Sequence, residues 1–307
     1  MRFGSLPITL RQLQYACAVA EELSFRKAAA RCHVSQPSLS AQIAELERML
    51  EVQLFERDRR RVLLTRAGEA VIGRARAVLL AAEDVVDAAT RHGDPLVGAL
   101  RVGVIPTIAP YLLPDLDPAL REAFANLQLQ WTEDKTETLV AMLGAGELDV
   151  ALLALEAEIG ELDYVKIGED PFVLAAPRGH ALAARRSAVT PEALADARVY
   201  LLDDGHCFRE QAADLCAVTG AREQGFRATS LTTLVQLAGG GDGVTILPAL
   251  AVEVENRRAR LVIRKFRRPA PRRTIVFAWR RGSALADSLR ELAAPARRAL
   301  AVATRGG

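Results

Sequence analysis

Residues 24–40 read SFRKAAARCHVSQPSLS, a stretch that predicts two short helices joined by a tight turn. Ser24 and Ser35 each stand where a helix would begin, and a serine hydroxyl there accepts a hydrogen bond from a free backbone amide of the first turn. Pro37 fits the first turn of the second helix because that turn needs no amide donor. From Leu39 onward, apolar residues recur at helical spacing, so one side of the second helix is buried and the other is exposed.

The flanking residues add one helix before this pair and two strands after it. Residues 8–22 have one apolar helical face, which consists of Leu10, Leu13, Ala16, Cys17 and Ala20. The apolar face of the helix after Ser35 consists of Leu39, Ile43, Leu46 and Leu50. Residues 56–65 are predicted to form a hairpin, because residues 62–64, VLL, favour a strand and the charged run 57–61, RDRRR, suits a hairpin tip. The prediction is a three-helix unit with a wing.

A long helix is predicted from Thr65 to Thr90. Its small apolar residues recur at alternating steps of four and three, the spacing of a coiled-coil seam that packs against a partner chain. The seam comprises Val71, Ala75, Val78, Ala82, Val85 and Ala89. The alternative is an amphipathic helix that packs on its own domain only. The position of the helix before the break Gly93-Asp94-Pro95 favours a dimerising linker.

Beyond this break, strands and helices alternate. Three strands with two intervening helices are predicted at 99–105, 111–125, 127–131, 136–146 and 150–155. Further strand-like runs follow at 172–175, 199–202, 244–247 and 274–279. Such alternation implies a parallel sheet, and the whole pattern fits two α/β lobes with a cleft between them.

These patterns divide the chain into three parts. We expect a DNA-binding domain at 8–66, a linker and dimerisation helix at 67–94 and an effector domain at 95–307. Within the effector domain, the first lobe would comprise residues 95–168 and 271–307, and the second lobe residues 169–270.

The composition limits where in the cell the protein is expected and which kinds of partner it can bind. The 307 residues carry a formal charge of only +2, but residues 1–66 hold eleven Lys and Arg against seven Asp and Glu. Apolar runs fall far short of the ~20 residues that span a bilayer, and no signal-peptide core follows Met1, so we expect a cytoplasmic protein without a membrane partner. The four cysteines form no disulfide framework, and Cys17 and Cys32 fit small buried positions.

The stretch 24–40, with Leu46-Glu47 and residues 54–57, LFER, resembles the LysR-type transcriptional regulators. Residues 143–149, LGAGELD, and 241–248, GDGVTILP, look like further hallmarks, so the resemblance covers essentially the whole chain. It implies an N-terminal all-α winged helix-turn-helix with a long linker helix, and a C-terminal α/β two-lobed effector domain like a periplasmic binding protein. It also implies a homotetramer, a dimer of dimers, that binds double-stranded DNA at a promoter operator and contacts RNA polymerase.

The candidate DNA-binding residues lie on the helix after the turn and on the wing. They are Ser35, Gln36, Pro37, Ser38 and Ala41 on the helix, and Arg57, Arg59, Arg60 and Arg61 on the wing. Glutamine can read adenine with two hydrogen bonds and serine can contact a base or a phosphate, whereas the arginines would contact the backbone and position the protein without specifying sequence. In an unrelated protein, this arginine run would be an ordinary solvated surface.

A second candidate site lies in residues 206–216, HCFREQAADLC. On spacing alone, Cys207 and Cys216 would most often be two buried structural thiols. They do not form a Cys-x-x-Cys motif, and the four histidines show no ligand spacing, so neither a metal nor a cofactor is expected.

This segment closely resembles the peroxide-sensing OxyR group of LysR-type regulators, in which the matching cysteines form an intramolecular disulfide on oxidation. The resemblance implies that Cys207 reacts with hydrogen peroxide and that Cys216 resolves the product. The matching peroxide-pocket positions are Thr107, Thr136, His206, Glu210 and Arg273. Glu210 departs from the group's usual aspartate, which displaces the carboxylate by about one methylene and puts the geometry of peroxide activation in question.

The chemistry requires Cys207 as a thiolate, and we expect Arg273, or His206 if charged, to lower its pKa. Attack on peroxide gives a sulfenic acid, which Cys216 converts to a disulfide. If residues 208–215 are helical, nine rises of ~1.5 Å place the two Cα atoms roughly 13.5 Å apart. A disulfide needs a separation within about 7 Å, so oxidation must unwind or refold the segment.

Two other functions share part of this pattern. A LysR-type regulator that binds a small organic anion in the interlobe cleft would keep the domains and leave the cysteines incidental. A thiol peroxidase with a DNA-binding domain would need repeated turnover, and the sequence has no Gly-x-Gly-x-x-Gly site for an electron donor. A sensor is therefore expected rather than an enzyme.

Overall fold

The computed structural model describes residues 7–57, 62–90, 96–184, 187–203 and 207–304. The chain divides into two compact units, Met1–His92 and Gly93–Gly307. None of the helices in these described ranges is long and apolar enough to cross a membrane.

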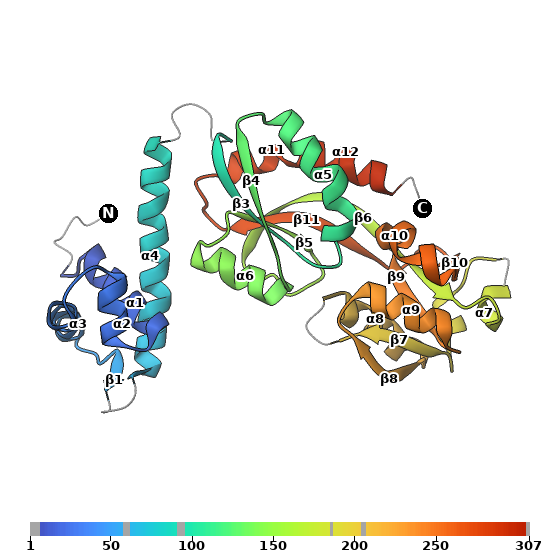
Figure 1. Cartoon of the computed structure of the whole chain (residues 1–307), viewed down its shortest axis with the longest axis horizontal. Helices are drawn as coiled ribbons and strands as arrows, with labels where there is room; N and C mark the ends of the chain where they lie inside the picture. The colour runs from blue at the N-terminus through green and yellow to red at the C-terminus, as the bar shows by residue number, and fades with distance from the viewer. Residues whose placement is uncertain (1–6, 58–61, 91–95, 185–186, 204–206, 305–307) are drawn as a thin grey trace. The chain divides into compact units, whose positions relative to one another are not determined.

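The N-terminal unit consists of helices and one hairpin (Figure 1). Its elements are α1 (Leu10–Glu22), α2 (Phe25–Arg31), α3 (Gln36–Leu50), β1 (Phe55–Arg57), β2 (Val62–Leu64) and α4 (Arg66–Thr90). The hydroxyls of Ser24 and Ser35 accept hydrogen bonds from the amides of Lys27 and Ser38, which confirms both predicted caps. A Thr9–Gln12 capping box begins α1 in the same way.

The core of this unit forms where the apolar faces of the helices meet. Ala16, Val19, Leu39, Ile43 and Leu46 have no exposed surface. Leu10 was expected on the buried face of the first helix, but 48% of it is exposed. That expectation is wrong because Leu10 is the first residue of α1, and the buried residues of the helix begin at Gln12.

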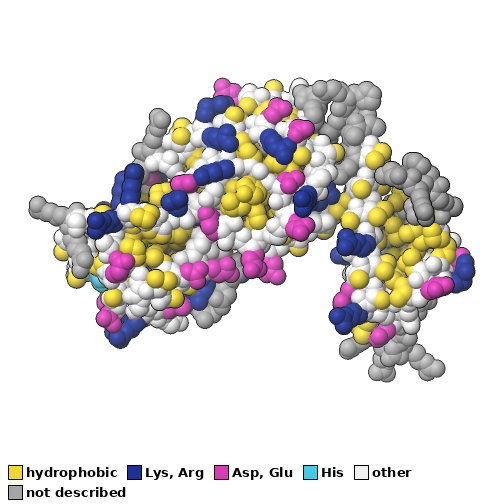
Figure 2. Space-filling view, turned by 180° about the vertical axis from the view of Figure 1, so that it is seen from behind, with side chains coloured by type: hydrophobic (Ala, Val, Ile, Leu, Met, Phe, Trp, Pro, Cys, Tyr) yellow, Lys and Arg dark blue, Asp and Glu magenta, His cyan; other side chains and the backbone are white. Residues whose placement is uncertain are grey.

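The residues of the predicted seam of α4 lie in two environments, one buried and one exposed. Of the seam residues, Ala75 is buried in the core of the N-terminal unit, where α4 packs against α1, and Val71 packs half-buried against the same core. Farther along the helix, Val78 and Val85 are 46% and 70% exposed, and Figure 2 shows hydrophobic side chains at the surface of this unit. The first turns of α4 therefore pack on their own domain, and the later valines are available to another chain.

A carboxylate on α3 anchors the start of the wing by hydrogen bonds. One oxygen of Glu47 accepts hydrogen bonds from the amides of Leu54 (2.8 Å) and Phe55 (3.1 Å). Strands β1 and β2 pair antiparallel, with Phe55 opposite Leu64. The predicted hairpin is confirmed by these strands, and its tip, residues 58–61, lies outside the described residues.

The C-terminal unit is a mixed α/β structure (Figure 1). Its first lobe contains β3 (Gly98–Val104), α5 (Ala109–Ala123), β4 (Leu127–Glu133), α6 (Thr136–Ala145), β5 (Val150–Ala154), β11 (Arg272–Arg280), α11 (Ala286–Glu291) and α12 (Ala293–Ala303). Strand β6 (Leu162–Ala176) continues into the second lobe, which contains α7 (Ala181–Ala184), the 3-10 helix η1 (Pro191–Leu194), β7 (Arg198–Leu202), α8 (Cys207–Thr219), β8 (Arg222–Ala228), α9 (Leu231–Gly240), β9 (Val244–Pro248), α10 (Ala249–Ala259) and β10 (Val262–Lys265).

The strands of this unit run in the order β4-β3-β5-β11-β6-β9-β7-β8, with β10 paired to β6. The pairs β3–β4, β3–β5, β7–β8 and β7–β9 are parallel, as expected. Strand β11 is antiparallel to β5 and β6, so the expectation of a wholly parallel sheet is wrong. The chain crosses to the second lobe along β6 and returns along β11, and these two strands must therefore run in opposite directions.

We expect Gly68→Ala to destabilise the N-terminal unit by about 1–3 kcal/mol. A Cβ on Gly68 would stand only 2.1 Å from the carbonyl oxygen of Leu54. Gly73→Ala on the same helix is the matched control, because nothing lies within 4 Å of its Cβ position. The control should stabilise the helix by about 0.5–1 kcal/mol. Hydrogen–deuterium exchange of α1 to α3 in the full chain measures both effects, and equal protection in the two variants would contradict the close packing of α4 on residue 54.

Candidate functional site

Cys207 is the first residue of α8 and faces a cavity in the C-terminal unit. The thiol residue is 7% exposed, and the cavity has a volume of about 510 Å³. Its lining comes from α6, the segment after β5, and α8, and consists of Thr136, Glu137, Val140, Ala157, Glu158, Cys207 and Glu210. Three predicted pocket residues, Thr136, Cys207 and Glu210, thus meet at one cavity.

The pKa of the Cys207 thiol is set by opposing influences. Burial raises this pKa and is the largest effect. The charge of Arg273 and the hydroxyl of Thr136 lower it, whereas the carboxylate of Glu210 raises it. Arg273 thus acts in the expected direction, and burial opposes it. His206 lies outside the described residues.

Arg273 is held in a buried ion pair on the central strands. Its guanidinium bonds to Asp170 at 2.9 Å, and neither side chain is exposed. Arg273 also donates to the hydroxyl of Thr107 at 2.7 Å and to the Thr107 carbonyl at 2.8 Å, while Asp170 accepts from the amide of Leu250 at 3.1 Å. Sequence reasoning missed Asp170. The sequence signal was an acidic residue beside the apolar run 172–176, because a carboxylate that is buried with such a run requires a cation.

Cys216 lies on the same continuous helix as Cys207. It is 5% exposed, and burial raises its pKa to about 11. Helix α8 includes both residues, so nine rises of ~1.5 Å separate their Cα atoms by roughly 13.5 Å. Nine steps of about 100° also put the two side chains on opposite faces of the helix. Both cysteines are free thiols, and a bond between them requires the helix to unwind.

The same helix carries a polar side chain that sequence reasoning missed. Both polar atoms of the Gln211 amide are buried without a hydrogen-bond partner in the described structure. An unsatisfied buried polar group costs about 1–3 kcal/mol. The stretch between the two cysteines is therefore less stable as a helix than its regular geometry implies, and only the packing around it could have shown this.

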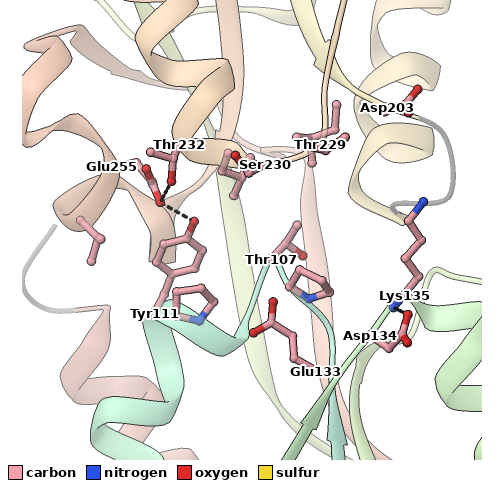
Figure 3. Close-up of a pocket in the computed structure, with 15 residues that line it drawn as sticks. Thr107, Tyr111, Glu133, Asp134, Lys135, Asp203, Thr229, Ser230, Thr232 and Glu255 are labelled. Carbon is pink, nitrogen blue, oxygen red and sulfur yellow. Dashed lines mark hydrogen bonds between the residues drawn. The ribbon is translucent and has the colours of Figure 1, made fainter.

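A second cavity, of about 680 Å³, lies between the two lobes (Figure 3). Among the described residues, its charged lining consists of Glu133, Asp134, Asp203 and Glu255 with one cation, Lys135. Glu255 is buried and accepts hydrogen bonds from the hydroxyls of Tyr111 (2.8 Å) and Thr232 (3.0 Å). Thr107 lines this cleft, and the structure does not place it in the cavity of Cys207. The acidic lining disfavours a small organic anion as the ligand of the cleft.

The predicted DNA-reading residues of α3 share one exposed surface. Ser35, Gln36, Pro37, Ser38 and Ala41 are all exposed, opposite the buried face of the helix. The Ser35 hydroxyl also caps α3. On the wing, Arg57 belongs to β1, whereas Arg59, Arg60 and Arg61 lie outside the described residues.

The other two cysteines are packing residues. Cys17 is buried in α1, where burial raises its pKa to about 11, and Cys32 is half-buried. Within the described part of the chain, no three His, Cys, Asp or Glu side chains are grouped so that they could hold a metal ion.

Comparison with known proteins identifies both units. Residues 10–69 match the bacterial regulatory helix-turn-helix of the LysR family, and residues 93–301 match the LysR substrate-binding domain. The DNA-binding transcriptional dual regulator OxyR of Escherichia coli is 42% identical over 287 residues, which cover 93% of this chain and 94% of that protein. The chain belongs to the LysR family of transcription regulators, in the OxyR group.

Other members of the group match this LysR-type regulator equally well. A probable hydrogen peroxide-inducible genes activator of Mycobacterium avium is 45% identical over 93% of this chain and 92% of its own length. A full-length OxyR variant of Pseudomonas aeruginosa has a TM-score of 0.76 at 33% identity, covering 95% of this chain and 96% of that one. A cysteine variant of Corynebacterium glutamicum OxyR, described as bound to H2O2, has a TM-score of 0.66 at 36% identity and covers 98% and 97% of the two chains.

The thiolate form of Cys207 should become more abundant as pH rises, because burial holds its pKa above the ordinary value. Alkylation by the neutral reagent iodoacetamide should therefore accelerate about tenfold per pH unit until that pKa is passed. Thr136→Val removes a hydroxyl that lowers the pKa, so its alkylation midpoint should move to higher pH. Peptide mass spectrometry follows each cysteine separately, and Cys216 serves as the internal control because its pH profile should be the same in the wild type and in Thr136→Val. An unchanged Cys207 midpoint would rule out the influence of Thr136.

Proposed function

We propose that this LysR-type regulator senses hydrogen peroxide at Cys207, with Cys216 as the resolving thiol. The observation that carries the proposal is the placement of Cys207 at a cavity beside the buried hydroxyl of Thr136, with a second thiol on the same helix. The relatives support it, since several are described as hydrogen peroxide-inducible genes activators and the related OxyR structures include oxidised and reduced forms.

The reaction takes two electrons from the two thiols. The Cys207 thiolate attacks one peroxide oxygen, the O–O bond breaks, and the departing hydroxide takes up a proton to form water. Cys216 then attacks the sulfur of the sulfenic acid, and a second water leaves as the disulfide forms. We assign the holding of the peroxide to the hydroxyl of Thr136, which lines the cavity of Cys207, whereas Thr107 acts through Arg273, to which it is hydrogen bonded.

Closure of the disulfide is the switching step. The Cα atoms of Cys207 and Cys216 must approach from roughly 13.5 Å to within about 7 Å, so α8 cannot remain helical between them. The unsatisfied amide of Gln211 lowers the cost of unwinding this helix. Unwinding then alters the surface of the second lobe, and through it the oligomer that binds DNA.

The DNA-binding part follows from the exposed face of α3. In this proposal Gln36 and Ser38, which are exposed on α3, read base edges in a major groove, and the arginines of the wing contact phosphates. The exposed valines of α4 fit a dimer seam, and we infer a tetramer built as a dimer of dimers, acting in the cytoplasm with RNA polymerase. The acidic interlobe cleft argues against the alternative of an organic-anion sensor. The family consists of transcription regulators, which leaves thiol peroxidase activity without support.

The two cysteine variants should behave differently. Cys207→Ser should abolish the response to peroxide, because an alcohol has too high a pKa to supply the nucleophile. Cys216→Ala should still oxidise, but should stop at a sulfenic acid that dimedone traps, or continue to sulfinic acid. Unreduced peptide mass spectrometry of the wild type should show a Cys207–Cys216 linked peptide, and limited proteolysis around residues 207–216 should change with oxidation. An unchanged proteolysis pattern would refute the switch even if the disulfide formed.

The two kinds of DNA contact should separate in binding measurements. Gln36→Ala and Ser38→Ala should each lose discrimination at particular base pairs, by about 1–3 kcal/mol for a bidentate contact. Arg59→Ala and Arg60→Ala should weaken binding to operator and random DNA about equally and reduce the dependence on salt. Titrations of both DNAs at several salt concentrations measure this. Unchanged discrimination in both α3 variants would remove α3 from the reading of bases.

A further inference from the structure

The cavity of Cys207 is acidic on three sides. Glu137 comes from the first turn of α6, Glu158 from the segment after β5, and Glu210 from the first turn of α8. All three carboxylates are exposed, no described residue forms an ion pair with any of them, and no described residue lining the cavity is a cation. Figure 2 also shows acidic side chains gathered along one edge of the C-terminal unit.

The inner wall of the cavity is built for an uncharged ligand that forms hydrogen bonds. Thr136 is only 8% exposed, and its hydroxyl oxygen is buried without a well-formed hydrogen bond in the described structure. Val140 and Ala157 supply an apolar wall beside it. The buried cation Arg273 is paired with Asp170 and does not line this cavity, although its charge lowers the pKa of Cys207. A ligand that reaches the thiol therefore meets negative charge at the mouth and, within, the thiol beside the buried hydroxyl of Thr136.

We propose that Glu137 and Glu158 make this cavity an electrostatic filter, which admits uncharged hydroperoxides to Cys207 and slows oxidants that carry a negative charge. The inference rests on the proposed reaction of Cys207 with peroxide and names the class of oxidant that the site selects. A reactive thiol alone does not discriminate among oxidants by charge. Carboxylates around the approach do so, because a field of one sign changes the local concentration of charged reactants and leaves neutral ones unaffected.

The expected size of the effect follows from the exposure of the carboxylates. Water and salt screen exposed charges, with a Debye length of about 10 Å at 0.1 M ionic strength. Steering by a charged cleft changes association rates by about 10-fold or more. We therefore expect roughly tenfold discrimination at low ionic strength, which should diminish as salt is added.

The test uses two hydroperoxides of the same shape. A tertiary alkyl hydroperoxide that carries a carboxylate is compared with its carboxamide, and hydrogen peroxide is the reference. The rate constant for loss of the Cys207 thiol is measured by quenched mass spectrometry on the full chain. The wild type should react with the carboxylate probe about tenfold more slowly than with the carboxamide at low salt.

Charge-neutralised variants decide the outcome. In the double variant Glu137→Gln/Glu158→Gln, the carboxylate probe should react several-fold faster, while the rates with the carboxamide and with hydrogen peroxide stay the same. The matched control Glu122→Gln/Glu147→Gln removes the same charge from exposed residues that do not line the cavity, and it should keep the discrimination of the wild type. A ratio of probe rates that is equal in all three proteins, or insensitive to salt, would overturn the filter. Failure of Cys207 to react with hydrogen peroxide in the wild type would instead overturn the proposed function.

Discussion

The buried pair of Arg273 and Asp170 is the interaction on which the effector unit depends. The two residues face each other in the register of β6 and β11, the strands that carry the chain between the lobes. Asp170 also accepts a hydrogen bond from the amide of Leu250 at the start of α10. Arg273 donates hydrogen bonds to both the hydroxyl and the carbonyl of Thr107. Two buried charges are tolerable only because each has a full set of partners, and loss of one partner typically costs about 3–5 kcal/mol. The pair therefore ties Thr107 of the first lobe and Leu250 of the second lobe to the two strands that connect the lobes.

The same cation links this framework to the reactive thiol. Arg273 lowers the pKa of Cys207, whereas burial, the larger influence, raises it. A buried thiol with a raised pKa is less reactive toward oxidants than a free thiolate. Reaction then depends on what the cavity can bind next to the sulfur, and a hydroxyl at Thr136 with carboxylates at the mouth favours a small neutral peroxide.

Helix α8 has contacts that stabilise it and one buried group that destabilises it. In the reduced state Cys207, Phe208, Ala212 and Cys216 are buried, which holds the helix against the second lobe. Phe208 packs edge to face on Phe172 of β6, with ring centroids 5.1 Å apart. These contacts oppose unwinding, whereas the unsatisfied amide of Gln211 favours it. A disulfide between sulfurs on opposite faces of this helix requires the helix to unwind, because the bond needs Cα atoms within about 7 Å.

The sequence by itself determined the features that depend on local spacing. The serine caps, the apolar face of α3, the hairpin and most strands of the effector unit were readable because caps and periodicity act over a few residues. The nine-residue separation of Cys207 and Cys216 likewise predicted their distance once α8 proved helical. Strands β8 and β10 and the first half of β6 were missed, since their polar residues conceal the pattern until neighbouring strands supply the pairing.

Only the tertiary structure decided which distant residues meet. Thr107 and Thr136 matched one pocket in the sequence, but folding sends Thr107 to the interlobe cleft and Thr136 to the cavity of Cys207. Gln211, Glu137 and Glu158 carried no local signal that would have singled them out, and the only signal of Asp170 was its place beside an apolar run. The net effect on the pKa of Cys207 was also hidden, because desolvation depends on everything that surrounds a thiol and a sequence shows only its neighbours along the chain.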